Sequence, residues 1–456
     1  MFGVSNKNVL AISDPQSVPN NSFGIHIANI QDLADAARLV NSGGGDWGYV
    51  TLVITKDNRL NNLWQDVFNQ MRKLHLIPIL RIATSENEGN WEKPDVNDID
   101  NWVSFFNSLN WVIKNRYVVV GNEVNSGKEW GGEVNPEQYA AYLKLFAEKL
   151  KGANPDYFII SAGFDASLPT KKGSLEEGTY LRRMVNKEPG IFDLVDGWAS
   201  HSYPNPNFSG SEYASGRGSI TTFEWELMYL KNLGVIKDLP VFITETGWAH
   251  QVAGNTKTKG FAKESTLSQK YVTAYNGAWG SKNIVAVTPF ILNYEFPPFD
   301  MFSWKNAGVF NSLYSSLLGL KKNLGEPVQE DVAAISKIFV PAIGFLGSDF
   351  TGIFFIENKG QTIWTKDKLS IQDNNGDNMT FEKSSFDSLE PGESGFIVFK
   401  GKTPTKAGSH EISLHLTRNK IKISNDSTFR ILSVETIEMK FRSVFDRLRK
   451  MWHPDS

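Results

Sequence analysis

The sequence contains no cysteine. This absence excludes disulfides, thiolate catalysis and metal sites built on cysteine. A charge excess of one sign is also missing, because 47 basic residues nearly balance 50 acidic ones and leave a formal net charge of -3. The chain therefore has no electrostatic footprint for nucleic acid and no large field to steer a charged substrate.

Long apolar runs are also missing. No stretch of about 18 uninterrupted apolar residues occurs, so we expect no transmembrane helix. The first dozen residues lack the basic and apolar regions of a signal peptide, although Val9-Leu10-Ala11 resembles the tail of one whose start is missing. The compartment stays open, and an extracellular or cell-surface location is expected if such a leader precedes the chain.

The first two thirds of the chain alternate β-like runs with amphipathic segments. Several runs are nearly continuous Val, Ile and Phe, which is typical of parallel strands buried on both faces. Strands are expected at residues 23–27, 49–54, 76–82, 117–120, 158–162, 194–199, 241–244 and 284–290. Helices are expected at 32–40, 63–74 and 136–150. Eight such units predict an α/β fold of the (β/α)₈ TIM-barrel type.

The pattern changes after residue 324. We predict an N-terminal extension at 1–22, the barrel at 23–324, a linker with one short helix at 325–348, an all-β sandwich domain at 349–433 and an amphipathic helical tail at 434–456. Within the all-β part, Asn375-Gly376 and Pro391-Gly392 are expected to form hairpin turns.

The tail predicts a helix with one apolar face and many basic residues on the rest of its surface. Such a helix can dock on its own domain. It can also contact a membrane surface or a protein partner. The apolar face comprises Ile437, Phe441, Val444, Phe445, Leu448 and Trp452.

Two peptides carry chemistry, Tyr117-Val-Val-Val-Gly-Asn-Glu-Val-Asn125 and Val241-Phe-Ile-Thr-Glu-Thr-Gly-Trp248. Each is an apolar strand that ends in a glutamate, and barrel active sites lie at the carboxyl ends of strands. Two carboxyl groups at one barrel mouth suit glycosidic cleavage, in which one donates a proton and the other attacks the anomeric carbon. We therefore predict Glu123 and Glu245 as catalytic residues.

With these motifs the chain resembles clan A of the glycoside hydrolases, the cellulase superfamily. The resemblance implies that Glu123, in Asn122-Glu123, is the acid/base, and that Glu245, at the end of strand seven, is the nucleophile. It further implies that Asn122 binds the substrate 2-hydroxyl. His201-Ser202-Tyr203 matches the His-x-Tyr that often ends strand six, which implies that Tyr203 hydrogen-bonds the nucleophile and that His201 lines the sugar site.

An arginine on an early strand usually lies by the nucleophile in this clan, and Arg81 is the best match. Arg81 could instead form a salt bridge at the barrel rim, and His201 could be a structural histidine. The chain departs from the clan at strand eight, where no tryptophan ends the strand. The ring that packs against the sugar is then expected to be Trp304, Trp248 or a phenylalanine. Further candidates for substrate binding on strand-end loops are His26, Trp47 and Trp130.

The rear domain resembles an immunoglobulin-like β-sandwich with a buried tryptophan, Trp364. Such modules are spacers or interaction domains, and a sugar-binding role is an alternative. The sequence as a whole predicts a retaining glycoside hydrolase that cleaves a β-linked oligo- or polysaccharide and needs no metal or organic cofactor. The alternatives are a catalytically inactive glycan-binding or cell-surface interaction protein, and a transglycosylase on the same scaffold.

Overall fold

The computed structural model of the protein describes residues 12–452, and side chains as far as residue 449. Val9-Leu10-Ala11 lies outside the described residues. The chain divides into two compact units that meet between Val328 and Gln329. Across residues 12–452, no helix has both the length and the apolar character that crossing a membrane requires.

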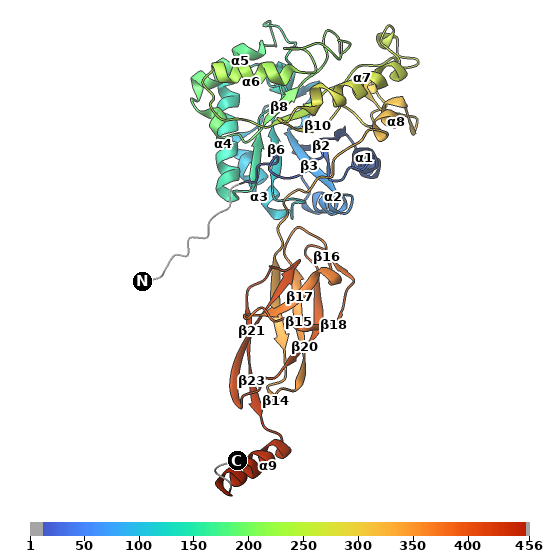
Figure 1. The fold of residues 1–456 in the computed structure, drawn as a ribbon. Coiled ribbons are helices and arrows are strands. Elements are labelled where there is room, and N and C mark those ends of the chain that lie inside the picture. Colours follow the sequence, from blue (N-terminus) through green and yellow to red (C-terminus); the bar gives the residue numbers. More distant parts are fainter. Residues whose placement is uncertain (1–11, 453–456) are drawn as a thin grey trace. The chain divides into compact units, whose positions relative to one another are not determined.

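The first unit is a mixed α/β domain whose long strands are all parallel (Figure 1). Five strands form one sheet in the order β1-β2-β3-β6-β7, and three form another in the order β10-β9-β8. The strands are β1 Gly24–Ile27, β2 Gly48–Thr55, β3 Leu76–Ala83, β6 Arg116–Val120, β7 Tyr157–Ile160, β8 Trp198–His201, β9 Val241–Glu245 and β10 Ile284–Val287.

Two single parallel bridges connect the outer strands of these sheets. Ile160 at the end of β7 pairs with Gly197 just before β8, and Phe23 just before β1 pairs with Val287 of β10. The α/β class and the parallel pairing agree with the sequence prediction.

Helices lie outside the strands of this unit (Figure 1). The strands have little alternation of polar and apolar residues because nearly all of their side chains are buried. The helices are α1 Leu33–Val40, α2 Asn61–Lys73, α3 Ile99–Ser108, α4 Pro136–Ala153, α5 Glu177–Lys187, α6 Thr222–Asn232, α7 Glu264–Asn276 and α8 Ser312–Leu318.

The sixth predicted strand, 194–199, is placed too early. The segment before β8 forms a 3-10 turn at Ile191–Asp193. Asp196 then holds the chain as a loop, because its carboxylate accepts hydrogen bonds from the Ile159 amide at 2.9 Å and from Lys151 Nζ at 2.7 Å. As a result His201 is the last residue of β8 and lies at the carboxyl end of the strand.

The second unit is built from antiparallel strands in two main sheets. One has the order β13-β15-β20-β18, and the other β14-β23-β21-β17, with β22 paired to β21 and only the β14–β23 pair parallel. The strands are β13 Ala333–Phe339, β14 Ile343–Phe345, β15 Asp349–Asn358, β17 Leu369–Asp373, β18 Thr380–Ser384, β20 Ser394–Lys402, β21 Gly408–Arg418, β22 Ile421–Lys422 and β23 Ser427–Val434, beside a small pair of β16 Trp364–Thr365 and β19 Ser388–Leu389.

Both sheets contribute to one apolar core. Phe354 and Phe399 come from the first sheet, Leu414 and Leu416 from the second, and Trp364 is fully buried among them. The indole N–H of Trp364 donates to Asp331 at 3.2 Å. The last element, α9 Ile437–Trp452, begins three residues after the expected start of the helical tail at residue 434.

One expectation for this part is wrong. The short helix expected between residues 325 and 341 is replaced by β13, whose register shift between Ile335 and Lys337 breaks the alternation that marks a strand. The turn at Asn375-Gly376 closes a short hairpin as expected, because Gln372 of β17 pairs antiparallel with Asn378 and the Met379 amide donates to the carbonyl of Ile371 at 2.9 Å. Beyond this hairpin the chain passes to the other sheet, since β17 pairs with β21 and β18 pairs with β20.

Candidate active site

Two glutamates meet at the carboxyl ends of β6 and β9. Glu123 follows β6 by three residues, and Glu245 is the last residue of β9. His201, at the end of β8, lies between them, with its Nδ1 2.9 Å from Glu123 Oε1 and 3.7 Å from Glu245 Oε2. The three side chains place one ligand-type atom each within 4.8 Å of one another. Residues from three separate strands thus form one site.

The backbone around Glu123 is held in an unusual conformation. Gly121 has φ 97° and Glu123 has φ 32°, a left-handed region that favours glycine. The amide of Glu123 donates to the carbonyl of Gly163 at 2.8 Å. This bond fixes the glutamate against the segment that follows β7.

Gly163 also makes room for the imidazole. A Cβ atom at position 163 would lie 2.2 Å from Cδ2 and 2.4 Å from Nε2 of His201. Only glycine therefore lets His201 lie where it reaches both carboxyl groups. Gly163 was not a candidate in the sequence.

Glu245 lies in surroundings that favour its ionised form. Burial alone would raise the pKa of this carboxyl, but the positive charges on His201 and Arg81, together with a hydrogen bond from Tyr203, hold its pKa below the ordinary value. The phenol of Tyr203 donates to Glu245 Oε2 at 3.1 Å.

Glu123 is shifted in the opposite direction. Burial raises the pKa of Glu123 above its ordinary value, His201 partly offsets the rise, and the charges on Glu245 and Asp165 add to it. Two carboxyl groups this close favour a state with one proton between them. The surroundings place that proton on Glu123 and leave Glu245 charged.

His201 has a raised pKa of its own. Burial lowers it, but the carboxylates of Glu245 and Glu123 raise it above the value of a free histidine. Two carboxylates and an imidazole are also donors that a divalent metal ion accepts, so the same three side chains are the candidate metal ligands among the described residues.

Three buried polar atoms near this pair have no hydrogen-bond partner among the described residues. They are Asn122 Oδ1, Arg81 Nε and His26 Nδ1. Burial lowers the pKa of His26 to about 3, so its ring is neutral. Because buried polar groups are rarely left unpaired, these atoms are available to bind water or a polar ligand.

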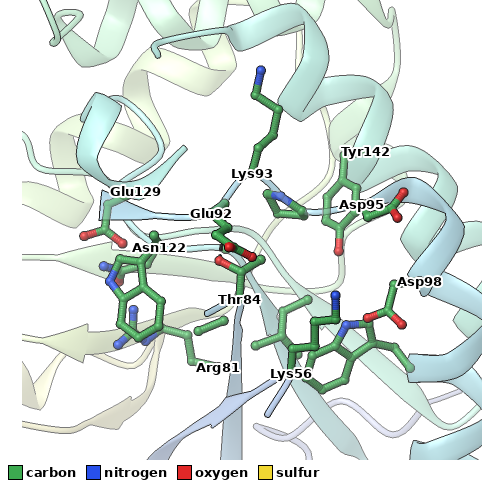
Figure 2. Close-up of a pocket in the computed structure, with 16 residues that line it drawn as sticks. Lys56, Arg81, Thr84, Glu92, Lys93, Asp95, Asp98, Asn122, Glu129 and Tyr142 are labelled. Atoms are coloured by element: carbon green, nitrogen blue, oxygen red, sulfur yellow. Dashed lines mark hydrogen bonds between the residues drawn. The ribbon is translucent and has the colours of Figure 1, made fainter. Parts of the chain in front are cut away.

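Arg81 and Asn122 also line a cavity of about 110 Å³. Figure 2 shows them with Glu129 on one side of it, and Tyr142, Asp98 and Lys56 on the other. The half-buried Trp91 also lines this cavity. Burial raises the pKa of Glu129 to about 7, although Arg81 opposes the shift.

The structure does not bring four predicted tryptophans to this site as exposed platforms. Trp47 lies at the amino end of β2, where it stacks on His75 with ring centroids 4.5 Å apart. Trp130 packs against Tyr139 and donates to Gln138 at 3.0 Å. Trp248 and Trp304 are fully buried, and both pack on Tyr271.

An aromatic cluster supports Tyr203 instead. The ring of Tyr203 lies 5.0 Å from Phe208 and 5.8 Å from Phe302, and Phe290 after β10 lies 5.9 Å from Phe302. The absence of a tryptophan after β10 is thus matched by phenylalanines in the same region. The cluster holds the phenol in place to donate to Glu245.

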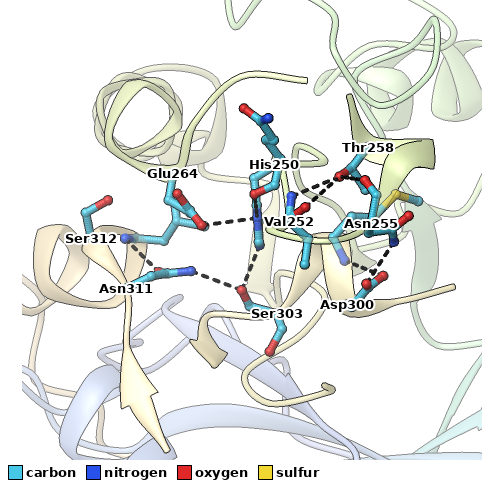
Figure 3. Close-up of polar contacts among 12 residues, drawn as sticks. His250, Val252, Asn255, Thr258, Glu264, Asp300, Ser303, Asn311 and Ser312 are labelled. Atoms are coloured by element: carbon cyan, nitrogen blue, oxygen red, sulfur yellow. Dashed lines mark hydrogen bonds and ion pairs between the residues drawn. The ribbon is translucent and has the colours of Figure 1, made fainter. Parts of the chain in front are cut away.

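Polar contacts tie the loops of this cluster together (Figure 3). His250 Nε2 lies 2.9 Å from the carbonyl of Ser303, its Nδ1 lies 3.4 Å from Glu264, and its amide donates to the carbonyl of Met301. Asn255 donates to Asp300 at 2.8 Å. The loop after β9 is thereby fixed to residues 300–303, which include Phe302.

Sequence reasoning missed Trp91, Glu129 and Gly163. Trp91 lies in a polar segment after β3, which is a signal for an exposed aromatic residue near strand ends. Glu129 follows the Asn122-Glu123 motif by six residues, a weak signal. Gly163 has no local signal, because its importance depends on a histidine 38 residues later in the sequence.

No family model matches the chain, and no curated protein matches it. Similar solved structures include a mannanase catalytic domain from Streptomyces sp. SirexAA-E, with 15% identity, a TM-score of 0.43, and 70% of this chain and 94% of that chain covered. A GH128 (subgroup II) endo-β-1,3-glucanase from Sorangium cellulosum has 15% identity, a TM-score of 0.42 and coverages of 66% and 96%. A glucosidase from Croceicoccus marinus has 10% identity, a TM-score of 0.48 and coverages of 91% and 94%. These neighbours are glycoside hydrolases, but at such identities and TM-scores the function of this chain has to be argued from its own site.

Proposed function

We propose that the protein is a retaining glycoside hydrolase that cleaves a β-linked oligo- or polysaccharide. The observation that carries this proposal is the convergence of Glu123 and Glu245 on His201, with ligand-type atoms of all three within 4.8 Å of one another. Retaining enzymes have carboxyl groups about 5–5.5 Å apart, whereas inverting enzymes leave about 6.5–9.5 Å for a water molecule. The short separation favours retention.

The eight parallel strands of the first unit are interpreted as a closed (β/α)₈ barrel of the clan A type. Support comes from the bridges Ile160–Gly197 and Phe23–Val287, which link the two sheets at both outer strands. The second unit is interpreted as an immunoglobulin-like sandwich. Its support is the single core that both sheets share around Trp364.

The first chemical step uses the opposite protonation states of the pair. Glu245 attacks the anomeric carbon as the bond to the leaving oxygen breaks, and Glu123 gives that oxygen its proton. A covalent glycosyl ester on Glu245 results. Tyr203 and Arg81 keep the nucleophile ionised before the attack.

The second step reverses the role of Glu123. Now a carboxylate, it takes a proton from water, whose oxygen attacks the anomeric carbon and breaks the ester to Glu245. The hydrogen bond from His201 fixes the orientation of Glu123 in both steps. The anomeric configuration is inverted twice and is therefore retained.

The substrate binds through hydroxyl groups and one apolar ring face. Asn122 and His26 offer unpaired polar atoms beside the reacting centre. Trp91 provides a ring in the adjoining cavity, where the C–H face of a neighbouring sugar can pack. This arrangement suits an oligosaccharide with at least two units in contact with the protein.

The test is a panel of aryl β-glycosides and β-linked polysaccharides, assayed with the wild type, Glu245→Gln and the control Glu148→Gln, which changes an exposed carboxyl on α4. We expect turnover by the wild type and the control, and none by Glu245→Gln, whose melting temperature should match that of the wild type. A fluorosugar should leave a covalent adduct on Glu245.

Three results would contradict the proposal. Wild-type rates in Glu245→Gln would exclude Glu245 as the nucleophile. Binding of a glycan without product would favour a glycan-binding protein, and loss of activity in EDTA would favour a metal held by Glu123, His201 and Glu245. If sugar acceptors outcompete water for the covalent intermediate, the enzyme is a transglycosylase.

A further inference from the structure

The helix α9 exposes an apolar stripe that nothing described in the structure covers. Phe445 is 70% exposed and Phe441 64%. Ile437, Val444 and Leu448 are also exposed. Among the side chains described on this helix, all except that of Ser443 are exposed. With Met439, six exposed apolar side chains lie within 13 residues, which is unusual for a helix whose only partner is water.

All of these side chains except that of Met439 lie on one face of the helix. At about 100° per residue, positions 437, 441, 444, 445 and 448 fall within an arc of about 100°. Arg442 and Arg449 border one edge of the arc, and Lys440 and Arg447 border the other. Glu438 also lies at the edge that Arg442 and Arg449 border, whereas Asp446 and Met439 lie opposite the stripe.

This distribution matches the chemistry of a lipid surface. Long basic side chains at the edges of an apolar stripe reach up to headgroups while the apolar residues enter the acyl boundary. Residues 437–449 contain four basic and two acidic side chains, a net charge of +2, whereas the whole chain has a net charge of -3. The positive charge is therefore local to the helix and favours an anionic surface.

Two other arrangements fit less well. A helix of 16 residues is about 24 Å long, which is shorter than the roughly 30 Å hydrocarbon core of a bilayer. A second copy of α9 packed on the stripe would place basic residues against basic residues along both edges. Neither objection applies to a helix that lies in the plane of an anionic membrane.

We propose that α9 is a membrane-surface anchor that binds anionic phospholipid bilayers through its apolar stripe and its basic edges. The proposal is independent of the reaction catalysed by the first unit. It assigns the end of the chain a function of its own, which is to hold the protein at a lipid surface.

The experiment is sedimentation of the full chain with vesicles of phosphatidylcholine mixed with phosphatidylglycerol, and with vesicles of phosphatidylcholine alone. We expect binding to the anionic vesicles to be at least about tenfold stronger and to weaken as salt is added. Phe441→Ser combined with Phe445→Ser should weaken it by at least about tenfold. The matched control Ile421→Ser, which removes an apolar side chain that is 70% exposed on β22, should bind as the wild type does.

The charge variant is Arg442→Glu combined with Arg449→Glu, and its control is Lys402→Glu combined with Lys406→Glu, which changes the net charge equally on exposed strand and loop positions. Only the first should lose the preference for anionic vesicles. Equal binding to both vesicle types, or equal losses in both charge variants, would overturn the proposal. So would a dimer in lipid-free solution that the phenylalanine variant abolishes, since a second copy would then cover the stripe.

Discussion

The substitution Gly163→Ala tests how the site is positioned without touching a group that reacts. The added methyl group would lie 2.2 Å from Cδ2 of His201, and ordinary contact begins near 3.4 Å. The imidazole would have to retreat by about 1.2 Å, the difference of these distances. It would then lose its 2.9 Å contact with Glu123. Because a displacement of about 1 Å in an active site costs about 100-fold in rate, we expect kcat/KM to fall by that factor.

The assay is kcat/KM on the best substrate of the glycoside panel, with a melting curve for each variant. The control is Gly152→Ala in α4, where an added Cβ meets no atom within 4 Å. It should keep full activity and gain stability, because alanine exceeds glycine in helix propensity by about 1 kcal/mol.

A double-mutant cycle separates displacement of the ring from general damage. In a His201→Ala background the added methyl group meets no imidazole, so Gly163→Ala should have little further effect on kcat/KM. Wild-type activity in Gly163→Ala, or additive losses in the double variant, would refute the reasoning.

Three further predictions concern the surroundings of the pair. Trp91→Ala should raise KM for polysaccharides more than for short aryl glycosides, as measured by steady-state kinetics, and equal effects on both would argue against a ring platform in the cavity. Tyr203→Phe removes the hydrogen bond that lowers the pKa of Glu245, so the acidic limb of the profile of kcat/KM against pH should move to higher pH. The value of kcat/KM should also fall by about tenfold, which corresponds to about 1.4 kcal/mol. An acidic limb at the wild-type pH would contradict this role of Tyr203. Glu177 and Glu226 are fully buried, and burial together with their mutual repulsion raises the pKa of Glu177, while burial raises that of Glu226. Their contribution to stability is therefore present below the ordinary carboxyl pKa, and it is lost as the pH rises through the raised pKa values of the folded protein. Glutamine at position 177 cannot lose a proton. Glu177→Gln should therefore melt about 2–4 °C higher than the wild type in alkaline buffer but not in acidic buffer.

Most of the parallel strands were predictable because burial on both faces leaves an uninterrupted apolar signal. The strand β2, for example, is almost entirely buried and was placed to within one residue at each end. The start of β8 was not predictable, since Leu194 and Val195 are as apolar as a strand but precede Asp196, whose hydrogen bond to Ile159 sets the boundary. Only the fold reveals such a partner.

The residues of the site divide in the same way. Glu123 and Glu245 could be found because each directly follows a strong strand signal in its own segment. The four tryptophans could not be assigned, because the sequence does not distinguish a ring on a surface from one packed in a core. Trp248, for instance, is a near neighbour of Glu245 in sequence, yet its indole is buried and donates to the carbonyl of Gly210.

Under the proposed mechanism, the left-handed backbone of Glu123 sets the stability of the fold against catalysis at a single position. Glycine or asparagine would adopt φ 32° at little cost, whereas a glutamate there is strained by about 1–3 kcal/mol. Selection for a higher melting temperature alone would therefore favour variants in which Glu123 is replaced. A mutant library designed to raise the melting temperature while keeping activity has to leave Glu123 unchanged.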